Sequence, residues 1–230
     1  MPFSIRRGVG SYLLVLVAAV WATCAEAADV AAEAAEGPVE LPAAAEVGAM
    51  SVEETIAARR SIRAFKPDEL SAERISQLLW SAQGITEPGR GLRAAPSAGA
   101  TYPLELYVAK ADGVFKYVPK GHLLRRVSEA DVRKKLSAAC YGQRWVAQAP
   151  VSFVITAVYE RTSRRYGDRA TRYVDIEAGC AAENLALQCV ALDLGTVIVG
   201  AFTDAEVAEL VGCAEGETPL MVLPVGVPAK

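Results

Sequence analysis

The sequence predicts a single α+β domain built on a mixed central sheet flanked by helices. The chain has 230 residues, 52% of them hydrophobic, which is enough to fill one core and too little for two large domains. From Ser51 onward, segments with helical and with strand periodicity alternate only loosely. Two apolar strand segments flank Asp112-Gly113, a hairpin signal, so part of the sheet is antiparallel. A doubly wound parallel sheet is therefore not expected.

The first 27 residues have the layout of a cleavable export signal. Arg6 and Arg7 precede an apolar run, Tyr12 to Trp21, and small residues follow up to Ala27. The run has about ten residues, whereas a membrane-spanning helix needs about twenty. We therefore expect residues 1–27 to be removed and the mature protein to be periplasmic, without a permanent membrane anchor. The paired arginines are compatible with the twin-arginine route, which carries folded proteins.

Residues 28–50 are rich in Ala and Glu and contain no Lys or Arg. Such a segment has little apolar surface to bury, so it predicts a flexible spacer; a short helix packed on the domain is the alternative. The folded domain is then expected over residues 51–230. Its positive and negative charges nearly cancel, which gives no electrostatic case for binding nucleic acid.

Two helices are expected to open the domain. Ser51 with Glu54 three positions on is a capping box, which predicts a helix running towards Arg59. Ser71 precedes a second helix over 74–83, which Gly84 ends. The apolar face of this helix is expected to hold Ile75, Leu78 and Leu79. A loop rich in Gly, Pro and Ala follows, from Gly84 to Pro103.

The rest of the domain is expected to alternate strands and helices. Strands are predicted over 104–109, 114–118, 151–158 and 220–225, with a further strand including 197–199. Helices are predicted over 131–139 and 173–192, the second ended by Gly195, and from Asp204 to Leu210.

The composition excludes several kinds of catalytic site. His122 is the one histidine, so a multi-histidine metal centre is impossible and no metal is expected. No CxxC pair, HExxH motif or Walker loop is present. His122 lies in a Pro-Lys-Gly-His turn, where a structural hydrogen bond is the expected role, and Trp80 and Trp145 are expected to pack. The protein is therefore expected to use the reactivity of a cofactor.

Four cysteines remain after the expected cleavage: Cys140, Cys180, Cys189 and Cys213. Cys180 and Cys189 lie nine positions apart on one predicted helix, roughly 13 Å along its axis, so they cannot bond to each other. Isolated buried thiols are expected, and the disulfide state is left open.

The segment Arg59-Arg60-Ser61-Ile62-Arg63 follows the first helix directly. Guanidinium groups bind phosphate through two parallel donors, and a serine hydroxyl adds one more. The segment therefore has the donors of a phosphate site. A solvated basic helix end, favourable to the helix dipole, is the alternative.

A second candidate is the run of small residues from Ala95 to Pro103, which leads into a strand. Small residues let the backbone approach a flat ligand closely, so its N–H groups can contact ring heteroatoms. An ordinary surface loop is the alternative.

The order of three segments resembles the nitroreductase family of FMN oxidoreductases. They are Arg59–Arg63, Pro96–Pro103 and Phe115–Leu124, and the last is similar to the SagB-type dehydrogenase branch. Further segments of the same kind are Glu177-Ala178-Gly179, Gly195–Phe202 and Leu223–Pro228. The resemblance covers residues 51–230 and implies the nitroreductase-like fold, an obligate homodimer and bound FMN.

The resemblance also implies the cofactor contacts. Arg59 would hold the FMN phosphate, and Arg63 would stabilise negative charge at the pyrimidine end of the ring. The loop from Pro96 to Gly99 would reach the flavin from the second subunit, which places the flavin at the subunit interface. The implied cofactor-binding residues are Arg59, Arg60, Ser61, Arg63, Pro96, Ser97, Ala98, Gly99, Val199, Gly200, Ala201 and Lys230.

No catalytic residue is assigned. The azole-forming relatives use a Lys-Tyr pair, and the nearest match is Arg172-Tyr173. Arginine is a poor base because its pKa is above about 12. Tyr173 and Tyr102 are therefore candidates for substrate-side acids or, as we favour, wall residues.

The expected function is an FMN-dependent oxidoreductase that transfers hydride through flavin N5 to or from a small organic substrate, such as a quinone or nitro compound. One alternative is a SagB-type maturation dehydrogenase acting on a peptide. Another is a flavin-binding protein without turnover. The physiological substrate, the electron donor and the direction of the reaction are left open.

Overall fold

The structure, a computed structural model, describes residues 37–229. The expected export signal, the first part of the expected spacer and Lys230 lie outside the described residues. The folded unit begins at Pro38.

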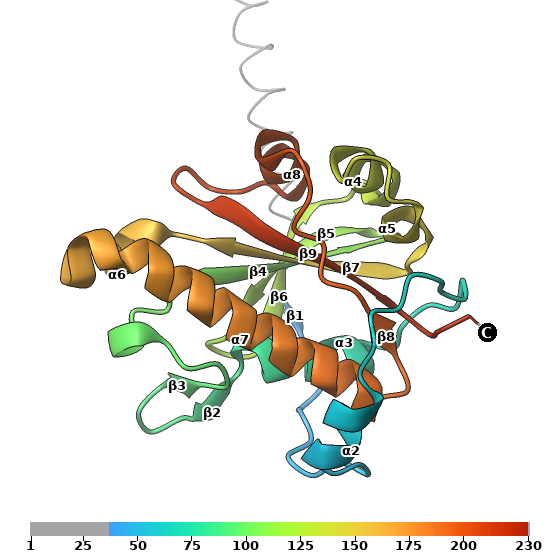
Figure 1. Cartoon of the computed structure of the whole chain (residues 1–230), viewed down its shortest axis with the longest axis horizontal. Coiled ribbons are helices and arrows are strands. Elements are labelled where there is room, and N and C mark those ends of the chain that lie inside the picture. Colours follow the sequence, from blue (N-terminus) through green and yellow to red (C-terminus); the bar gives the residue numbers. More distant parts are fainter. Residues whose placement is uncertain (1–36, 230) are drawn as a thin grey trace, which may run out of the picture. The chain divides into compact units, whose positions relative to one another are not determined.

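A seven-stranded sheet forms the centre of this unit, in the order β1-β6-β5-β4-β7-β9-β8 (Figure 1). The strands are β1 (Val39–Glu40), β4 (Leu104–Lys110), β5 (Gly113–Val118), β6 (Leu123–Ser128), β7 (Val151–Ala157), β8 (Gly195–Thr196) and β9 (Thr218–Gly226). A separate hairpin joins β2 (Ile85–Glu87) and β3 (Leu92–Arg93). All pairs of named strands are antiparallel, and a parallel pairing occurs at the isolated bridge of Ser61 with Thr196.

Helices cover both faces of the sheet (Figure 1). One face packs against α3 (Ala72–Gln83) and the long α7 (Ala170–Ala191). The other packs against α4 (Arg133–Ala139), α5 (Arg144–Gln148) and α8 (Asp204–Val211). The remaining helices are α2 (Val52–Ala58), α6 (Tyr159–Tyr166) and the short 3-10 turns η1 (Ala98–Ala100) and η2 (Gly167–Arg169). The predicted α+β class is confirmed.

The strands separate two hydrophobic cores because side chains alternate between the faces of a sheet. In β7, Phe153 and Ile155 join the core under α3 and α7, while Val154 joins the core under α4 and α8. Every residue of β7 is buried. The sequence of this central strand is mostly apolar for that reason, with Ser152 and Thr156 as its polar residues.

The helix signals at the start of the domain are confirmed. The Ser51 hydroxyl accepts from the backbone N–H of Glu54 at 3.2 Å, and the Glu54 carboxylate accepts from the N–H of Ser51 at 2.7 Å. On α3, Ile75, Leu78 and Leu79 are buried as predicted. The cap of α8 is Thr203 rather than Asp204, which lies in the first turn.

The structure corrects the expected spacer over residues 38–50, which we call the N-terminal strap. In the strap, β1 pairs with β6, and the backbone of Ala45 both donates to and accepts from the Gln77 side chain, at 2.7 and 3.0 Å. The Ser76 hydroxyl donates to the carbonyl of Pro42 at 2.5 Å and lies 2.6 Å from Nε2 of His122. The strap is therefore part of the fold, because polar side chains of α3 bind its backbone.

Several elements were not predicted, among them β1, the β2–β3 hairpin within the expected loop 84–103, β6, α5 and α6. The strand β6 carries two adjacent arginines, and α5 and α6 are short and polar, so none shows a clear apolar period. A strand was expected over 197–199, whereas the named strand is Gly195–Thr196 and Val199 forms an isolated bridge with Val222. Whether these short strands and helices form therefore depends on their contacts with distant parts of the chain.

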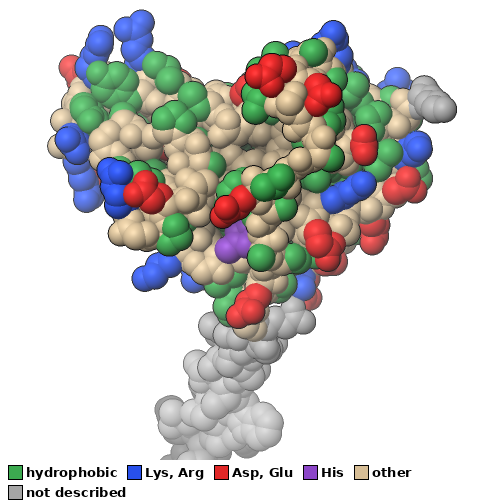
Figure 2. All heavy atoms as spheres, turned by 90° about the horizontal axis from the view of Figure 1, so that it is seen from below, with side chains coloured by type: hydrophobic (Ala, Val, Ile, Leu, Met, Phe, Trp, Pro, Cys, Tyr) green, Lys and Arg blue, Asp and Glu red, His purple; other side chains and the backbone are tan. Residues whose placement is uncertain are grey.

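The surface mixes both signs of charge, with basic side chains gathered along the edge where α6 lies (Figure 2). Within residues 37–229, no helix is long and apolar enough to cross a membrane. Cys140, Cys180, Cys189 and Cys213 are free thiols, as expected. His122 makes the expected structural hydrogen bonds, because its Nδ1 also lies 2.8 Å from the Tyr117 hydroxyl.

Candidate functional site

The segment after α2 runs beside β8. The N–H of Ile62 donates to the carbonyl of Thr196 at 2.9 Å, and Ser61 forms the parallel bridge with Thr196. A Cβ on Gly195 would lie 2.7 Å from the Ile62 side chain, so a glycine is needed for this close approach. The predicted phosphate segment and the run Val199–Ala201 are thereby brought to the same edge of the domain.

The three guanidinium groups of this segment have different surroundings. Arg59 Nε lies 3.5 Å from Glu183 Oε1 on α7, and its side chain is 37% exposed. Arg63 stacks over the Trp145 ring at 5.7 Å. Arg60 Nη1 instead donates to the carbonyls of Ala57 and Arg59, at 3.0 and 2.7 Å. All three side chains are at least partly exposed, and Arg60 also caps the C-terminus of α2.

The backbone of the run Val199–Ala201 is accessible at Gly200. Val199 is buried and exchanges two backbone hydrogen bonds with Val222, both 2.9 Å. Gly200 is exposed, and nothing lies within 4 Å of the place where its Cβ would be. The carbonyl of Ala201 accepts from Gln143 Nε2 at 3.2 Å. With Arg59, Ser61 and Arg63, this open backbone fits a flat ligand that carries a phosphate, such as FMN.

The loop Pro96–Gly99 lies against α6 and α7 instead. The Ser97 hydroxyl accepts from the N–H of Tyr102 at 2.9 Å, and Arg165 Nη1 donates to the carbonyl of Gly99 at 3.3 Å. Gly99 has a φ of 62°, and a Cβ there would lie 2.6 Å from the Tyr166 hydroxyl. Among residues 37–229, no hydrogen bond or ion pair joins this loop to Arg59–Arg63 or to Val199–Ala201. One chain therefore holds the two halves of the predicted site apart.

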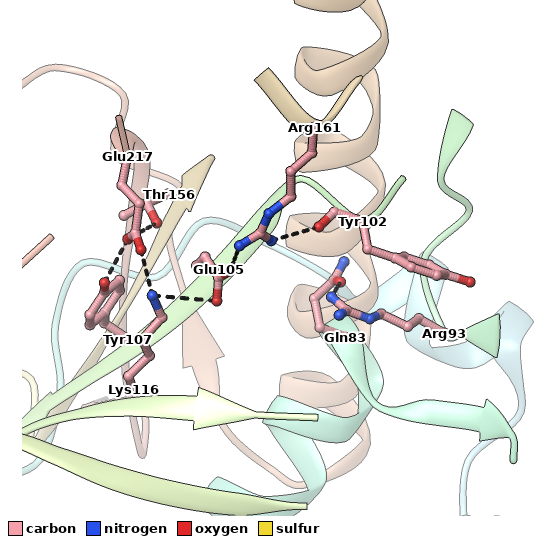
Figure 3. Close-up of polar contacts among 9 residues, drawn as sticks. All are labelled: Gln83, Arg93, Tyr102, Glu105, Tyr107, Lys116, Thr156, Arg161 and Glu217. Carbon is pink, nitrogen blue, oxygen red and sulfur yellow. Dashed lines mark hydrogen bonds and ion pairs between the residues drawn. The ribbon is translucent and has the colours of Figure 1, made fainter. Parts of the chain in front are cut away.

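Tyr102 is held from both sides (Figure 3). Arg161 Nη1 donates to its carbonyl at 2.9 Å, and the Arg93 guanidinium stacks over its ring at 4.4 Å. Arg161 also pairs with Glu105. Since Tyr102 has a φ of 47°, an unusual value for a tyrosine, these contacts maintain the bend before β4.

The second candidate pair lies on the same side of the domain. The Tyr173 ring meets the Tyr166 ring edge-on at 5.1 Å, and Arg169 lies 5.9 Å from its centroid. Arg172 is exposed. These packed rings support the wall interpretation of Tyr173.

Sequence reasoning missed a role for Glu177 on α7. Its side chain is 3% exposed, and its Oε1 has no hydrogen-bond partner. Burial raises the pKa of Glu177 to about 7, although the Ser97 hydroxyl and the Arg93 guanidinium oppose the shift. Its spacing from Val174 and Ala181, both buried, places it on the apolar face of the helix, a signal present in the sequence.

A small cavity lies next to the predicted FMN residues, and two larger cavities lie elsewhere in the domain. A cavity of about 240 Å³, lined by Arg60, Ile62 and Thr196 among others, lies next to the phosphate segment. Ligand pockets typically measure about 300–1,000 Å³. Two larger cavities, of about 680 and 690 Å³, are lined by other segments. Of the predicted FMN residues, Arg60 lines the small cavity, Val199 is buried, and the others that the structure describes are at least partly exposed.

The described part of the chain contains no group of three or more His, Cys, Asp or Glu that could hold a metal ion.

Comparison with known proteins identifies relatives over nearly the whole described unit. The model of the family described as "Nitroreductase family" matches residues 56–227. A protein of Methanocaldococcus jannaschii named as a nitroreductase is 41% identical over 194 residues, 82% of this chain and 95% of that protein.

Two further relatives are more distant. A crystal structure named as a nitroreductase from Ralstonia eutropha has a TM-score of 0.78 and 30% identity, and covers 85% of this chain and 91% of that one. The microcin B17-processing protein McbC of Escherichia coli is 24% identical over 153 residues, 62% of this chain and 56% of that protein.

Proposed function

Because this chain belongs to the nitroreductase family, whose matches support a flavin-dependent oxidoreductase in general, we propose that it is an FMN-dependent oxidoreductase. Its substrate would be a small organic molecule such as a quinone or nitro compound. The observation that supports the proposal is the bridge of Ser61 with Thr196, since it joins the predicted phosphate segment to the chain four residues before Gly200, whose backbone is uncovered.

Each half of the site would have its own task. Bound FMN would supply hydride transfer at its N5 atom. Arg59 would exchange its exposed contact with Glu183 for the phosphate, and the Ser61 hydroxyl would add a donor. Arg63 would place a fixed positive charge near the pyrimidine edge. Lys230 remains a candidate for a second phosphate contact.

A second copy of the chain would complete the site. The loop Pro96–Gly99 is held by Arg165 and Tyr102, away from Arg59 within one chain. In a homodimer, this loop would cover the cofactor bound by the other subunit and would exclude water from it.

The test is flavin occupancy in matched variants. The purified wild type should show flavin absorbance bands, and Arg59→Ala should lose about 90% of the bound FMN, since a charge-assisted contact contributes about 1.5–3 kcal/mol. Arg90→Ala removes an equally charged but exposed arginine near the β2–β3 hairpin and should keep full occupancy. Wild-type protein that stays colourless in excess FMN would contradict the proposal, as would a flavin-saturated monomer in light scattering.

The match to McbC favours a second candidate, a SagB-type dehydrogenase that acts on a peptide. Against azole formation, the nearest match to the lysine of those enzymes is Arg172, and a guanidinium does not release a proton near neutral pH. Oxidation of azoline-containing peptides, with no reduction of quinones or nitroaromatics, would favour this candidate. Bound flavin that no donor reduces would instead favour a binding protein without turnover.

We also infer export to the periplasm from the arrangement of residues 1–27, without a permanent membrane anchor. Fractionation followed by N-terminal sequencing tests this inference. A mature protein that begins after Ala27 is the expected result, and an uncleaved protein in the cytoplasm would contradict it.

A further inference from the structure

The backbone on both sides of Arg63 is held by the sheet edge and the C-terminal segment. The N–H of Ile62 donates to the carbonyl of Thr196 at 2.9 Å, and the carbonyl of Ala64 accepts from the N–H of Ala229 at 2.9 Å. The Cα atom of Arg63 is therefore fixed between two backbone hydrogen bonds. Only its side chain can change direction.

The side chain of Arg63 is oriented by an aromatic ring. Its Cζ atom lies 5.7 Å from the centroid of the Trp145 ring, within the range of about 6 Å at which a cation and an aromatic face attract each other. Arg63 is exposed, and within residues 37–229 its guanidinium makes no hydrogen bond or ion pair. The ring contact therefore leaves the N–H donors of this guanidinium available to a ligand.

The ring of Trp145 is itself held by the domain. It packs against the core under α4 and α8, and the next residue, Val146, is fully buried. The Nε1 atom of Trp145 is buried and has no hydrogen-bond partner among residues 37–229. A phenylalanine would avoid this unpaired N–H, whereas an indole attracts a cation more strongly than a phenyl ring does. The contact with Arg63 therefore gives a reason for a tryptophan at this position.

The start of α5 also binds the second predicted cofactor segment, the run 199–201. Gln143, the residue before α5, donates from its Nε2 to the carbonyl of Ala201 at 3.2 Å. The carbonyl of Gln143 accepts from the buried Ser137 hydroxyl at 2.9 Å, which ties the start of α5 to α4. This short helix therefore contacts the phosphate segment through Trp145 and the run 199–201 through Gln143.

We propose that Trp145 is a positioning residue, which holds the guanidinium of Arg63 where it meets the pyrimidine edge of bound FMN. The inference rests on the proposed FMN-dependent function. That edge is more negative in reduced than in oxidised FMN. A cation held in place stabilises this charge better than a mobile one, since nothing has to reorganise when the charge appears. Through Arg63, Trp145 therefore raises the reduction potential of the bound FMN.

The first test is a nuclear magnetic resonance measurement that needs neither flavin nor a variant. In the wild type, the Nε–H group of Arg63 should have an order parameter above about 0.6, the value below which a group is flexible. Arg144 is the matched control, since it is the exposed neighbour of Trp145 on α5 and makes no hydrogen bond or ion pair within residues 37–229. Its order parameter should lie below this value. Equal mobility of the two arginines would overturn the inference.

The second test is the reduction potential of the flavin in matched variants, measured against a reference dye. Trp145→Leu should bind reduced FMN about tenfold more weakly relative to oxidised FMN, which corresponds to a potential lower by about 30 mV for a two-electron couple. Trp145→Phe keeps an aromatic face, and this ratio should stay within about threefold of the wild type. Trp80→Leu, which removes a half-buried tryptophan of α3, should leave the potential unchanged. Equal potentials in Trp145→Leu and Trp80→Leu would contradict the proposal.

A double-mutant cycle shows whether Trp145 acts through Arg63. Arg63→Ala should lower the potential at least as much as Trp145→Leu does. Adding Trp145→Leu to Arg63→Ala should then lower it no further, because the cation that the ring positions is already absent. Additive shifts would overturn the positioning role.

Failure of this inference can be distinguished from failure of the proposed function. Protein that takes up no FMN would overturn both. Flavin-loaded protein whose potential does not respond to Trp145→Leu would overturn the positioning role alone. If Trp145→Leu does not fold, the order parameter of Arg63 in the wild type decides instead.

Discussion

The side chains of Glu177 and Glu217 are both buried, but their surroundings are opposite. The Glu217 side chain is 3% exposed, and its carboxylate receives Lys116 Nζ at 2.5 Å, the Tyr107 hydroxyl at 2.6 Å and the Thr156 hydroxyl at 3.2 Å (Figure 3). Glu177 has no such set of donors, and its Oε1 has no hydrogen-bond partner among residues 37–229. One carboxyl group is held by a cation and two hydroxyl groups, whereas the other keeps an oxygen without a partner.

The comparison shows that the hydrogen-bond and ion-pair partners of a buried carboxyl group, rather than its burial, determine whether it stabilises the fold or remains available for chemistry. Lys116 also lies 3.5 Å from Glu105, which pairs with Arg161, so the Glu217 network connects β4, β5 and α6. A satisfied network of this kind stabilises the arrangement of the sheet. An incompletely paired carboxyl contributes little to stability and is available for chemistry.

The largest expected effect is at the paired carboxylate. Lys116→Met leaves Glu217 buried without its cation and should lower the free energy of unfolding by about 4 kcal/mol, since breaking a buried pair costs about 3–5 kcal/mol. Lys110→Met removes a lysine that pairs with the more exposed Asp112 and should cost less than about 1 kcal/mol. Urea denaturation measures the free energy of unfolding of both variants. Equal losses in Lys116→Met and Lys110→Met would contradict the difference between the buried and the exposed ion pair.

A somewhat smaller effect is expected at the unpaired carboxyl, and it depends on pH. The pKa of Glu177 is raised from 4.5 to about 7, so the folded state binds more protons than the unfolded state and stability falls as the pH rises between these values. At 1.36 kcal/mol per pKa unit, the wild type should lose about 3 kcal/mol over this range from this group. Glu177→Gln should not show this loss in denaturation curves recorded across the range. Parallel curves for the two proteins would contradict the assignment.

The smallest effect tests a single hydrogen bond. Thr156→Val keeps the shape of the side chain and removes the 3.2 Å donor to Glu217, which should cost about 1 kcal/mol because Lys116 and Tyr107 remain. Calorimetry should show a slightly lower melting temperature. A loss as large as that of Lys116→Met would mean that the three donors act as one unit.

Part of the proposed site was predictable and part was not. The phosphate segment and the loop Pro96–Gly99 stand out because each concentrates suitable donors or small residues over a few positions. The capping role of Arg60 could not be predicted from the sequence. Its contacts with the carbonyls of Ala57 and Arg59 depend on the backbone conformation at the C-terminus of α2. The resemblance placed Glu177 in a motif, but only its burial in the folded protein shows its unusual state.

The sequence by itself determined the local features of this protein: the capping box at Ser51, the hairpin at Asp112-Gly113 and the inward face of α3. Each depends on interactions between residues a few positions apart, which one short segment contains completely. The tertiary structure alone decided that the strap 38–50 packs on α3, that β6 pairs with β1 and that Glu217 is paired while Glu177 is not. These outcomes depend on which distant groups meet when the cores close, because a buried polar group takes its character from partners that the neighbouring sequence does not contain.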